Sequence, residues 1–247
     1  MKKPYYSIII PAYNEEKIIS STIKKIYTFL KEQKKPFELI ITDDGSKDST
    51  LKIVHELSKK YKEIRSVSNK INLGRGAALA NAFRNSNGNI LIYIDADLAI
   101  DLELFPRLMK AIEEQGADIA IGSKHLKESQ VEYPKLRRIF SKCYAFLAHI
   151  LLKSNIKDYQ CGFKAFKRER ILELSPYIKN KGWAWDTEVV IKAQWMGWKV
   201  IELPAKVINI YGRESKVKLL SDVKRMGMDL LKLYLEKKKF KKNKHLS

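Results

Sequence analysis

Short apolar runs alternate with longer amphipathic segments through the first half of the sequence, and this alternation limits the fold more than any other feature. The runs are four to six residues long and rich in isoleucine, as in buried strands, and the segments between them have helical periodicity. Such a succession forms parallel strands wrapped by helices, so we expect an α/β fold with a Rossmann-like, mostly parallel sheet flanked by helices. The strands are expected at residues 5–10, 37–42, 64–67, 89–94 and 118–121, and the helices at 15–31, 49–61, 76–85 and 102–114.

The second half of the sequence does not continue this alternation. Residues 134–153 form a basic and apolar stretch of helical character, a region rich in glycine and aromatic residues follows, and residues 200–203 are again strand-like. We therefore expect one large domain and a basic amphipathic C-terminal helix and tail. The expected boundaries are 1–215 for the domain, with halves 1–122 and 123–215, and 216–247 for the C-terminal segment.

The net charge is the unusual feature of the composition. The 247 residues include 48 Lys and Arg against 28 Asp and Glu, a formal charge of +20. This excess predicts attraction to a polyanion or to an anionic membrane surface. Residues 216–247 carry eleven of the cations and three of the anions, and residues 136–152 interleave Arg and Lys with apolar residues. Basic amphipathic helices of this kind lie in the headgroup plane of a membrane, whereas a solvated, frayed tail better describes residues 237–247 when unbound.

The cysteines and the apolar runs bear on the cellular setting. Cys143 and Cys161 lack metal-ligand spacing, so we expect free thiols in a reducing compartment. The N-terminus has no signal-peptide apolar region, and no run of about 18 apolar residues occurs. We therefore expect no transmembrane helix.

Two carboxylates, Asp95 and Asp97, follow directly after the apolar run 89–94. Ligands of open α/β sheets bind at the carboxyl ends of the strands, so these acids are expected at the mouth of a site. Hard divalent cations take oxygen ligands, and Mg²⁺ often takes one or two carboxylates and completes its shell with water and substrate phosphates. The pair is a candidate site for Mg²⁺ or Mn²⁺, and a polar turn is the alternative.

Three more loops follow predicted strands and should converge on the same crevice. Asp43 and Asp44 offer acceptors to a base or ribose, Gly74 and Gly76 permit close approach to a ligand, and Arg75 can pair with a phosphate. Residues 43–46 also fit a plain turn followed by a helix cap. Neither a dinucleotide-binding nor a P-loop glycine pattern occurs. The candidate ligand-binding residues are Pro11, Ala12, Tyr13, Asn14, Glu15, Asp43, Asp44, Gly74, Arg75, Gly76, Asp95, Ala96 and Asp97.

Taken in order, these motifs resemble those of the family 2 glycosyltransferases. They are Pro-Ala-Tyr-Asn-Glu at 11–15, Asp-Asp-Gly-Ser at 43–46, Gly-Arg-Gly-Ala-Ala-Leu at 74–79 and Asp-Ala-Asp at 95–97. Motifs at 122–126, 158–164, 183–188 and 215–216 resemble the branch that glycosylates polyprenyl phosphates, and most of all the dolichyl-phosphate glucosyltransferases. The resemblance covers roughly residues 5–235.

The resemblance implies a GT-A fold with a donor half, an acceptor half and amphipathic interfacial helices. It implies inverting transfer of a hexose from a nucleotide-diphosphate sugar to a dolichyl or polyprenyl phosphate, by a peripheral enzyme on the cytoplasmic face of a membrane. Related mannose synthases carry Gln two residues after the second Asp of the metal motif, where this chain has Ala99, and this departure favours UDP-glucose as donor. Transfer from GDP-mannose, or transfer to a polysaccharide or protein hydroxyl, is the alternative.

The resemblance also implies roles for individual residues. Asp95 and Asp97 would hold Mg²⁺ or Mn²⁺ at the leaving diphosphate, and basic residues of the second half would hold the acceptor phosphate. The implied catalytic residues are Asp95, Asp97, Lys124, Asp186 and Glu188, and the implied acceptor-phosphate binders are Ser123, Lys124, Arg137, Arg138, Arg213, Ser215 and Lys216.

A phosphate acceptor changes what catalysis requires. A lipid phosphate monoester is mostly dianionic near neutral pH, since its second pKa is about 6, so it hardly needs a general base. It needs cations that position it. A helix-capping or ion-pair role for Asp186 is therefore as compatible with the sequence as a catalytic one. Two other classes of function are alternatives: a nucleic-acid-binding module, for which no recognised motif is present, and a nucleotidyltransferase, which would release pyrophosphate.

Overall fold

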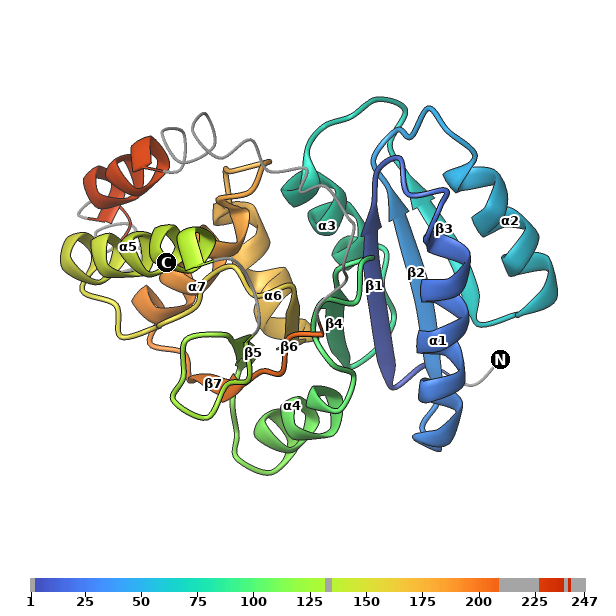
Figure 1. Ribbon diagram of the computed structural model, residues 1–247, viewed down its shortest axis with the longest axis horizontal. Coiled ribbons are helices and arrows are strands. Elements are labelled where there is room, and N and C mark those ends of the chain that lie inside the picture. Colours follow the sequence, from blue (N-terminus) through green and yellow to red (C-terminus); the bar gives the residue numbers. More distant parts are fainter. Residues whose placement is uncertain (1–2, 132–134, 209–226, 238–239, 241–247) are drawn as a thin grey trace.

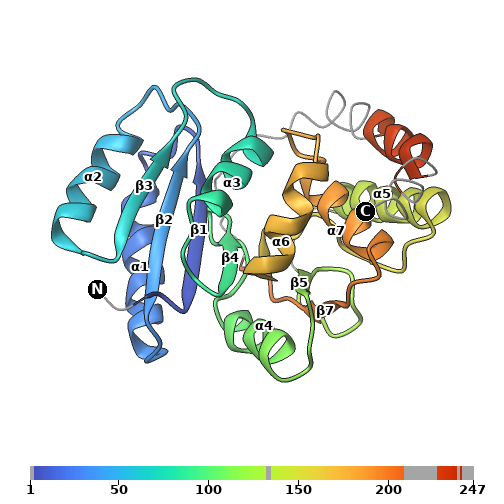
Figure 2. The same ribbon diagram turned by 180° about the vertical axis from the view of Figure 1, so that it is seen from behind.

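The computed structural model describes residues 3–131, 135–208, 227–237 and 240. Its centre is a seven-stranded sheet with the strand order β3-β2-β1-β4-β6-β5-β7, and helices lie on both faces (Figures 1 and 2). The strands are β1 (Tyr6–Ala12), β2 (Phe37–Asp43), β3 (Ile64–Ser68), β4 (Ile90–Ile94), β5 (Ile119–Ser123), β6 (Phe163–Lys167) and β7 (Val200–Pro204).

The sheet is mostly parallel, as the sequence predicts. β1 pairs in parallel with β2 and β4, β2 pairs in parallel with β3, and β5 pairs in parallel with β7. The exception is β6, which inserts between β4 and β5 and runs antiparallel to both. β6 was not predicted from the sequence. Its second residue is a lysine, Lys164, which reads as exposed in the sequence and is wholly buried in the structure.

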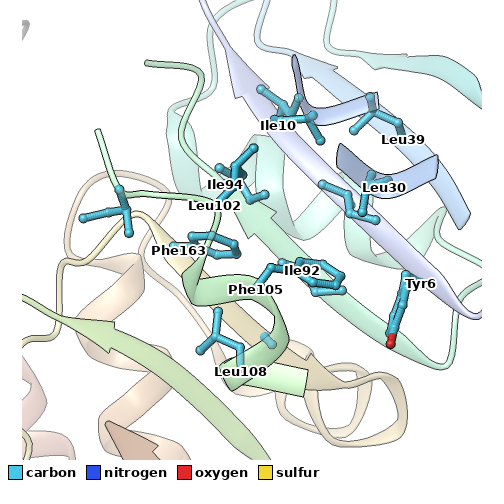
Figure 3. Packing of buried hydrophobic residues seen from close by; sticks show 14 of the residues in the cluster. Tyr6, Ile10, Leu30, Leu39, Ile92, Ile94, Leu102, Phe105, Leu108 and Phe163 are labelled. Carbon is cyan, nitrogen blue, oxygen red and sulfur yellow. The ribbon is translucent and has the colours of Figure 1, made fainter. Parts of the chain in front are cut away.

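Each face of the sheet is covered by its own set of helices. The helices are α1 (Ile19–Glu32), α2 (Thr50–Lys60), α3 (Arg75–Arg84), α4 (Leu104–Glu113), α5 (Lys135–Leu152), α6 (Arg168–Leu174) and α7 (Trp185–Trp195), with a 3₁₀ turn at Ser175–Tyr177. Strand residues alternate between the two faces, so that Ile8 and Ile10 share a core with α1, α2 and α4, while Ile9 shares a core with α3, α5, α6 and α7. Figure 3 shows the first of these cores, where Leu30 and Phe105 approach the strands.

The predicted elements of the first half are confirmed to within a few residues. The largest difference is at α1, which begins at Ile19 where the sequence predicts residue 15, because Glu15 accepts hydrogen bonds from Ile18 and Ile19 in a preceding turn. In the second half, α6 and α7 were not predicted. α7 is buried on all sides from Trp185 to Ala193, so it lacks the polar stripe that marks an amphipathic helix.

The C-terminal segment lies beside α5. Residues 227–237 are helical, and both views place this helical segment (red) against α5 (yellow-green). Lys237 Nζ donates to the carbonyl oxygen of Leu152 at 3.0 Å, and Leu230 and Leu233 are buried. The predicted boundary between residues 215 and 216 lies outside the described residues and stays a prediction.

Candidate active site

The loops that follow β1, β2 and β4 meet at one edge of the sheet. Ala12, the last residue of β1, is in register with Asp43, the last residue of β2, and the amide of Asp44 donates to the Ala12 carbonyl at 2.9 Å. Asp95 begins the loop after β4. β4 pairs with β1 on the side of β1 opposite β2. Because all three strands are parallel, their carboxyl ends share this edge. The structure therefore brings together the candidate residues of the first half.

Asp43 and Asp44 are neighbours with different surroundings. Asp44 accepts hydrogen bonds from the Asn69 side chain at 2.8 Å and from the amides of Leu73 at 2.9 Å and Gly74 at 2.8 Å, so it shapes the loop that leads into α3. Asp43 Oδ2 accepts from the Ser46 amide at 3.2 Å. Asp43 Oδ1 is buried and has no hydrogen-bond partner among the described residues. Asp43 thus offers an acceptor where Asp44 has used both oxygens.

The loop after β1 is held against the loop after β2. Pro11 and Ala12 belong to β1 itself. Asn14 has a left-handed backbone (φ +52°), donates its amide to Ser46 Oγ at 2.9 Å and accepts from the Lys47 amide at 2.9 Å. The Glu15 amide donates to Thr50 Oγ1 at 2.8 Å. These bonds fix Tyr13, Asn14 and Glu15 beside Asp43.

Gly74 and Gly76 allow another part of the chain to approach the start of α3. Gly74 has φ +98°, and a Cβ there would lie 2.4 Å from the Lys181 carbonyl oxygen. The Gly76 amide donates to that same oxygen at 2.8 Å, and a Cβ on Gly76 would lie 2.5 Å from the Trp185 side chain. The close approach seen at these glycines is that of residues 181–185, so they fix the first turn of α3 and with it Arg75.

Arg75 connects two carboxylates. Its Nη2 lies 2.6 Å from Asp95 Oδ1, and its Nη1 pairs with Asp186 Oδ2. The guanidinium also lies over the rings of Tyr93, at 5.0 Å, and Trp183, at 5.6 Å. Burial alone would lower the pKa of Arg75, but the charges of Asp186 and Asp95 outweigh it and hold the pKa well above its ordinary value. Arg75 therefore stays charged and links the loop after β4 to α7.

Asp186 is the buried end of this cluster. Its Oδ1 accepts from Lys164 Nζ at 2.6 Å and from the Tyr93 hydroxyl. Burial alone would raise the pKa of Asp186, but Arg75 and Lys164 outweigh it and hold the pKa below its usual value. The ion-pair role that the sequence left open for Asp186 is the one its contacts show.

Lys164 and Tyr93 belong to this cluster and were not predicted from the sequence as members of the candidate site. Lys164 Nζ donates to the Tyr93 hydroxyl at 2.6 Å and to the Cys161 carbonyl at 2.8 Å, in addition to Asp186. Tyr93 is wholly buried, and burial together with the Asp186 charge raises the pKa of its hydroxyl well above the usual range. For Lys164 the sequence offered two signals, its place in the motif at 158–164 and its position between Phe163 and Ala165 in a run that is otherwise apolar.

The metal ligands that the side chains of Asp95 and Asp97 can offer are carboxylate oxygens. The Asp95 amide donates to the Gly162 carbonyl at 2.9 Å, and a Cβ on Gly162 would overlap Asp95 Oδ2, so the carboxylate packs directly against that glycine. Asp97 Oδ1 accepts from the Ala99 amide at 3.1 Å, and Ala99 has no side-chain ligand to add. Among the described residues no group of three or more His, Cys, Asp or Glu could hold a metal. Two carboxylates suit a hard cation whose remaining ligands come from water and substrate phosphates.

The candidate acceptor residues begin at the end of β5. Ser123 is buried, and Lys124 lies with its amide 2.9 Å and its Nζ 3.4 Å from Asp158 Oδ2. Lys124 Nζ also donates to the Gln160 carbonyl at 3.5 Å. The segment 158–162 thus begins at Asp158, which contacts Lys124, and ends at Gly162, whose carbonyl accepts from the Asp95 amide. Lys124 and Asp95 therefore contact the same short segment of chain, residues 158–162.

Other predicted acceptor residues cannot be placed in this way. Arg137 and Arg138 lie in the first turn of α5, and their side chains are outside the described part of the structure. Arg213, Ser215 and Lys216 lie outside the described residues altogether. Their assignment stays a prediction.

Glu188 points into the protein. Its oxygens accept from the amides of Lys179, at 3.1 Å, and Asn180, at 2.7 Å, and from Lys192 Nζ at 2.6 Å. Lys192 is also wholly buried and pairs with Glu236 of the C-terminal helical segment at 3.2 Å. Glu188 therefore holds the loop whose Lys181 carbonyl fixes the start of α3.

Comparison with known proteins identifies relatives of this chain. The model of glycosyl transferase family 2 matches residues 7–174. Glycosyltransferase AglD of Haloferax volcanii is 34% identical over 92% of the chain, which spans 36% of that protein. A dolichyl-phosphate beta-glucosyltransferase of Dictyostelium discoideum is 34% identical over 93% of the chain and 73% of its own length. A dolichol-phosphate mannosyltransferase of Pyrococcus furiosus is 36% identical over 86% of the chain and 59% of its own length.

Solved structures support the fold. Glucosyl-3-phosphoglycerate synthase from Mycobacterium tuberculosis, in complex with Mn²⁺, UDP and glucosyl-3-phosphoglycerate, superposes with a TM-score of 0.68 at 20% sequence identity. The match covers 95% of this chain and 80% of that one. The α/β fold expected from the sequence is thereby confirmed.

Proposed function

The chain belongs to glycosyltransferase family 2, and from this premise we propose that it transfers a hexose from a nucleotide-diphosphate sugar to a dolichyl or polyprenyl phosphate, with inversion at the sugar. UDP-glucose is the favoured donor. One observation carries the proposal: a buried acceptor on Asp43, a cation on Arg75 and the carboxylates of Asp95 and Asp97 lie along one edge of the sheet. These groups match the base, the diphosphate and the metal of such a donor.

Each part of the donor has a matching group. The unpartnered Oδ1 of Asp43 can accept a hydrogen bond from an N–H of the base. This bond would satisfy a buried oxygen that otherwise has no partner among the described residues. Arg75 presents a planar fork of donors suited to phosphate oxygens. Asp95 and Asp97 would hold Mg²⁺ or Mn²⁺, and when bound such an ion supplies Lewis-acid stabilisation of the leaving diphosphate.

The acceptor is inferred from the state of the acidic residues. Transfer to a hydroxyl requires a general base, whereas a phosphate monoester is already ionised near neutral pH. Asp186 is bound by Arg75, Lys164 and Tyr93, and Glu188 is bound by Lys192 and two amides. Both carboxylates are buried and engaged, which supports a phosphate acceptor positioned by Lys124 over a hydroxyl acceptor.

Attachment to a membrane surface follows from the lipid acceptor. Large apolar side chains are exposed on α5, at Phe146, Leu147 and Ile150, and on the adjoining helical segment, at Leu231 and Leu235. α5 is basic, and exposed apolar side chains on and beside a basic helix suit insertion into the headgroup region of an anionic leaflet. In the part of the chain that the structure describes, no helix has the length and apolar character needed to cross a bilayer. We propose peripheral binding at the cytoplasmic face.

GDP-mannose is the second candidate donor. The resemblance to the Pyrococcus furiosus dolichol-phosphate mannosyltransferase supports it. Ala99, which offers only its amide to Asp97, supports UDP-glucose, because the mannose synthases usually carry glutamine there.

A product assay tests the proposal. The protein would be incubated with UDP-glucose, other UDP-sugars or GDP-mannose, with Mg²⁺ or Mn²⁺, and with a polyprenyl phosphate or the matching polyprenol. Mass spectrometry would identify the glycolipid. We expect glucosyl phosphoryl polyprenol from UDP-glucose and no product from the alcohol. Efficient glycosylation of the polyprenol would replace this proposal with the hydroxyl-directed alternative.

A further inference from the structure

Arg75 makes an asymmetric connection between a buried carboxylate and one at the surface of the site. The side chain of Asp186 is 4% exposed and is also held by Lys164 and Tyr93, whereas that of Asp95 is 36% exposed. Arg75 itself is only 12% exposed, between the rings of Tyr93 and Trp183. The Asp186 end of the pair is therefore the anchor, and the Asp95 end is the one that a ligand can reach.

The charges of this cluster balance without a metal. Asp95 and Asp186 supply two negative charges, and Arg75 and Lys164 supply two positive charges. A divalent cation arriving alone at Asp95 would meet the guanidinium already on Oδ1, at 2.6 Å. A cation arriving with a diphosphate brings anionic oxygens that can take over the Nη2 donor of Arg75.

We propose that Arg75 holds Asp95 in the nucleotide-free protein and passes from Asp95 to the donor diphosphate when nucleotide and cation bind together, while Asp186 and Lys164 keep its other side in place. This inference rests on the proposed function. It assigns Arg75 a competition with the divalent cation as well as a contact with phosphate. Its consequence is that cation and nucleotide bind with positive coupling, and that the coupling depends on Arg75.

The competition can be measured without turnover. Mn²⁺ binding to the full chain would be followed by the electron paramagnetic resonance of free Mn²⁺, with and without UDP, and UDP binding by calorimetry. Losing a charge-assisted hydrogen bond changes an affinity roughly ten- to a hundredfold. We expect Arg75→Gln to bind Mn²⁺ alone about tenfold more tightly than wild type, and to bind UDP at saturating Mn²⁺ about tenfold more weakly. The increase in Mn²⁺ affinity caused by UDP should largely disappear.

Arg75→Lys separates contact from general charge. It keeps the positive charge, but a single ammonium cannot span two carboxylates as the guanidinium fork does. We expect it to bind Mn²⁺ alone at least about threefold more tightly than wild type, since Asp186 retains the cation. Arg84→Gln, at the exposed C-terminal end of the same helix, is the matched control and should behave as wild type.

Each outcome decides something. If neither Arg75 variant binds Mn²⁺ alone more tightly than wild type, Arg75 does not compete with the cation. If Arg75→Gln binds Mn²⁺ more tightly but Arg75→Lys does not, the positive charge acts without the contact. In both cases the inference is wrong while the proposed function stands. If wild type binds neither Mn²⁺ nor UDP, the proposed function fails and the inference with it. Should Arg75→Gln not fold, as judged by circular dichroism, Arg75→Lys alone decides between these outcomes.

Discussion

The ammonium of Lys164 lies 2.6 Å from Asp186 Oδ1, and both side chains are buried, with 0% and 4% of their surface exposed. Removing Lys164 breaks a buried ion pair and leaves Asp186 with Arg75 as its remaining cationic partner, which costs at the lower end of about 3–5 kcal/mol. We expect Lys164→Met to lower the free energy of unfolding by about that amount in urea. Lys167→Met, on the same strand but at a partly exposed pair with Asp118, should cost no more than about 1 kcal/mol. Equal losses in the two variants would contradict a special role for Lys164.

The pH dependence of stability follows from the same cluster. The pKa of Asp186 lies below its usual value in the folded protein, so between the folded and unfolded pKa values the unfolded chain binds more protons. The stability that Asp186 contributes is therefore present above its unfolded pKa of about 3.9 and is lost as the pH falls through its folded pKa. We expect the unfolding free energy to fall as the pH drops below about 4, and to fall less steeply in Asp186→Asn. Urea titrations from pH 6 to about 3 would measure both slopes.

Asp97 is expected to be indispensable for transfer. Asp97→Asn removes an anionic oxygen ligand, so a divalent cation is held less firmly and the leaving diphosphate loses its compensation. We expect kcat to fall by about a hundredfold or more with circular dichroism unchanged, and the same for Asp95→Asn. Asp101→Asn, in the following loop and paired with Lys206, is the control and should retain activity. Wild-type turnover of both metal-site variants at saturating Mn²⁺ would show that these carboxylates are not the metal ligands.

Lys124 tests the acceptor. Its Nζ is 3.4 Å from Asp158 and is close to the chain that backs Asp95. Lys124→Ala should raise the KM for a polyprenyl phosphate about ten- to a hundredfold, the value of a charge-assisted hydrogen bond, and leave the KM for the donor nearly unchanged. Lys127→Ala, an exposed lysine three residues on, should change neither constant. An effect confined to the donor KM would move Lys124 to the donor side of the site.

The exposed apolar face of α5 and the C-terminal helical segment is expected to bind vesicles. Truncation of the C-terminus would also remove Leu230 and Leu233 from the core and Glu236 from Lys192, so surface substitution is the sharper experiment. Leu231→Glu combined with Leu235→Glu should weaken binding to anionic vesicles at least about tenfold. The charge-matched control is Lys24→Gln with Lys25→Gln on α1, which lowers the net charge equally. If control and test weaken sedimentation with vesicles equally, charge alone drives attachment.

The sequence by itself determined the first half of the fold and the common location of the loops after β1, β2 and β4. Its strands and helices there have local signatures, such as the apolar run before Asp95, and parallel strands necessarily bring their carboxyl ends to one edge. Asp43, Asp95 and Asp97 could be predicted as site residues on this ground alone.

Only the tertiary structure decided the second half and the connections beneath the site. β6 is buried on both faces, so its sequence lacks the alternation of polar and apolar residues that marks a half-exposed strand. α7 is buried on all sides, so its sequence lacks the polar stripe of an amphipathic helix. Lys164 and Lys192 are charged side chains whose burial depends on carboxylates from other elements or from a neighbouring turn of the same helix. Arg75 and Asp186 form an ion pair although they are 111 residues apart in the chain. Only the folded structure brings such partners into contact.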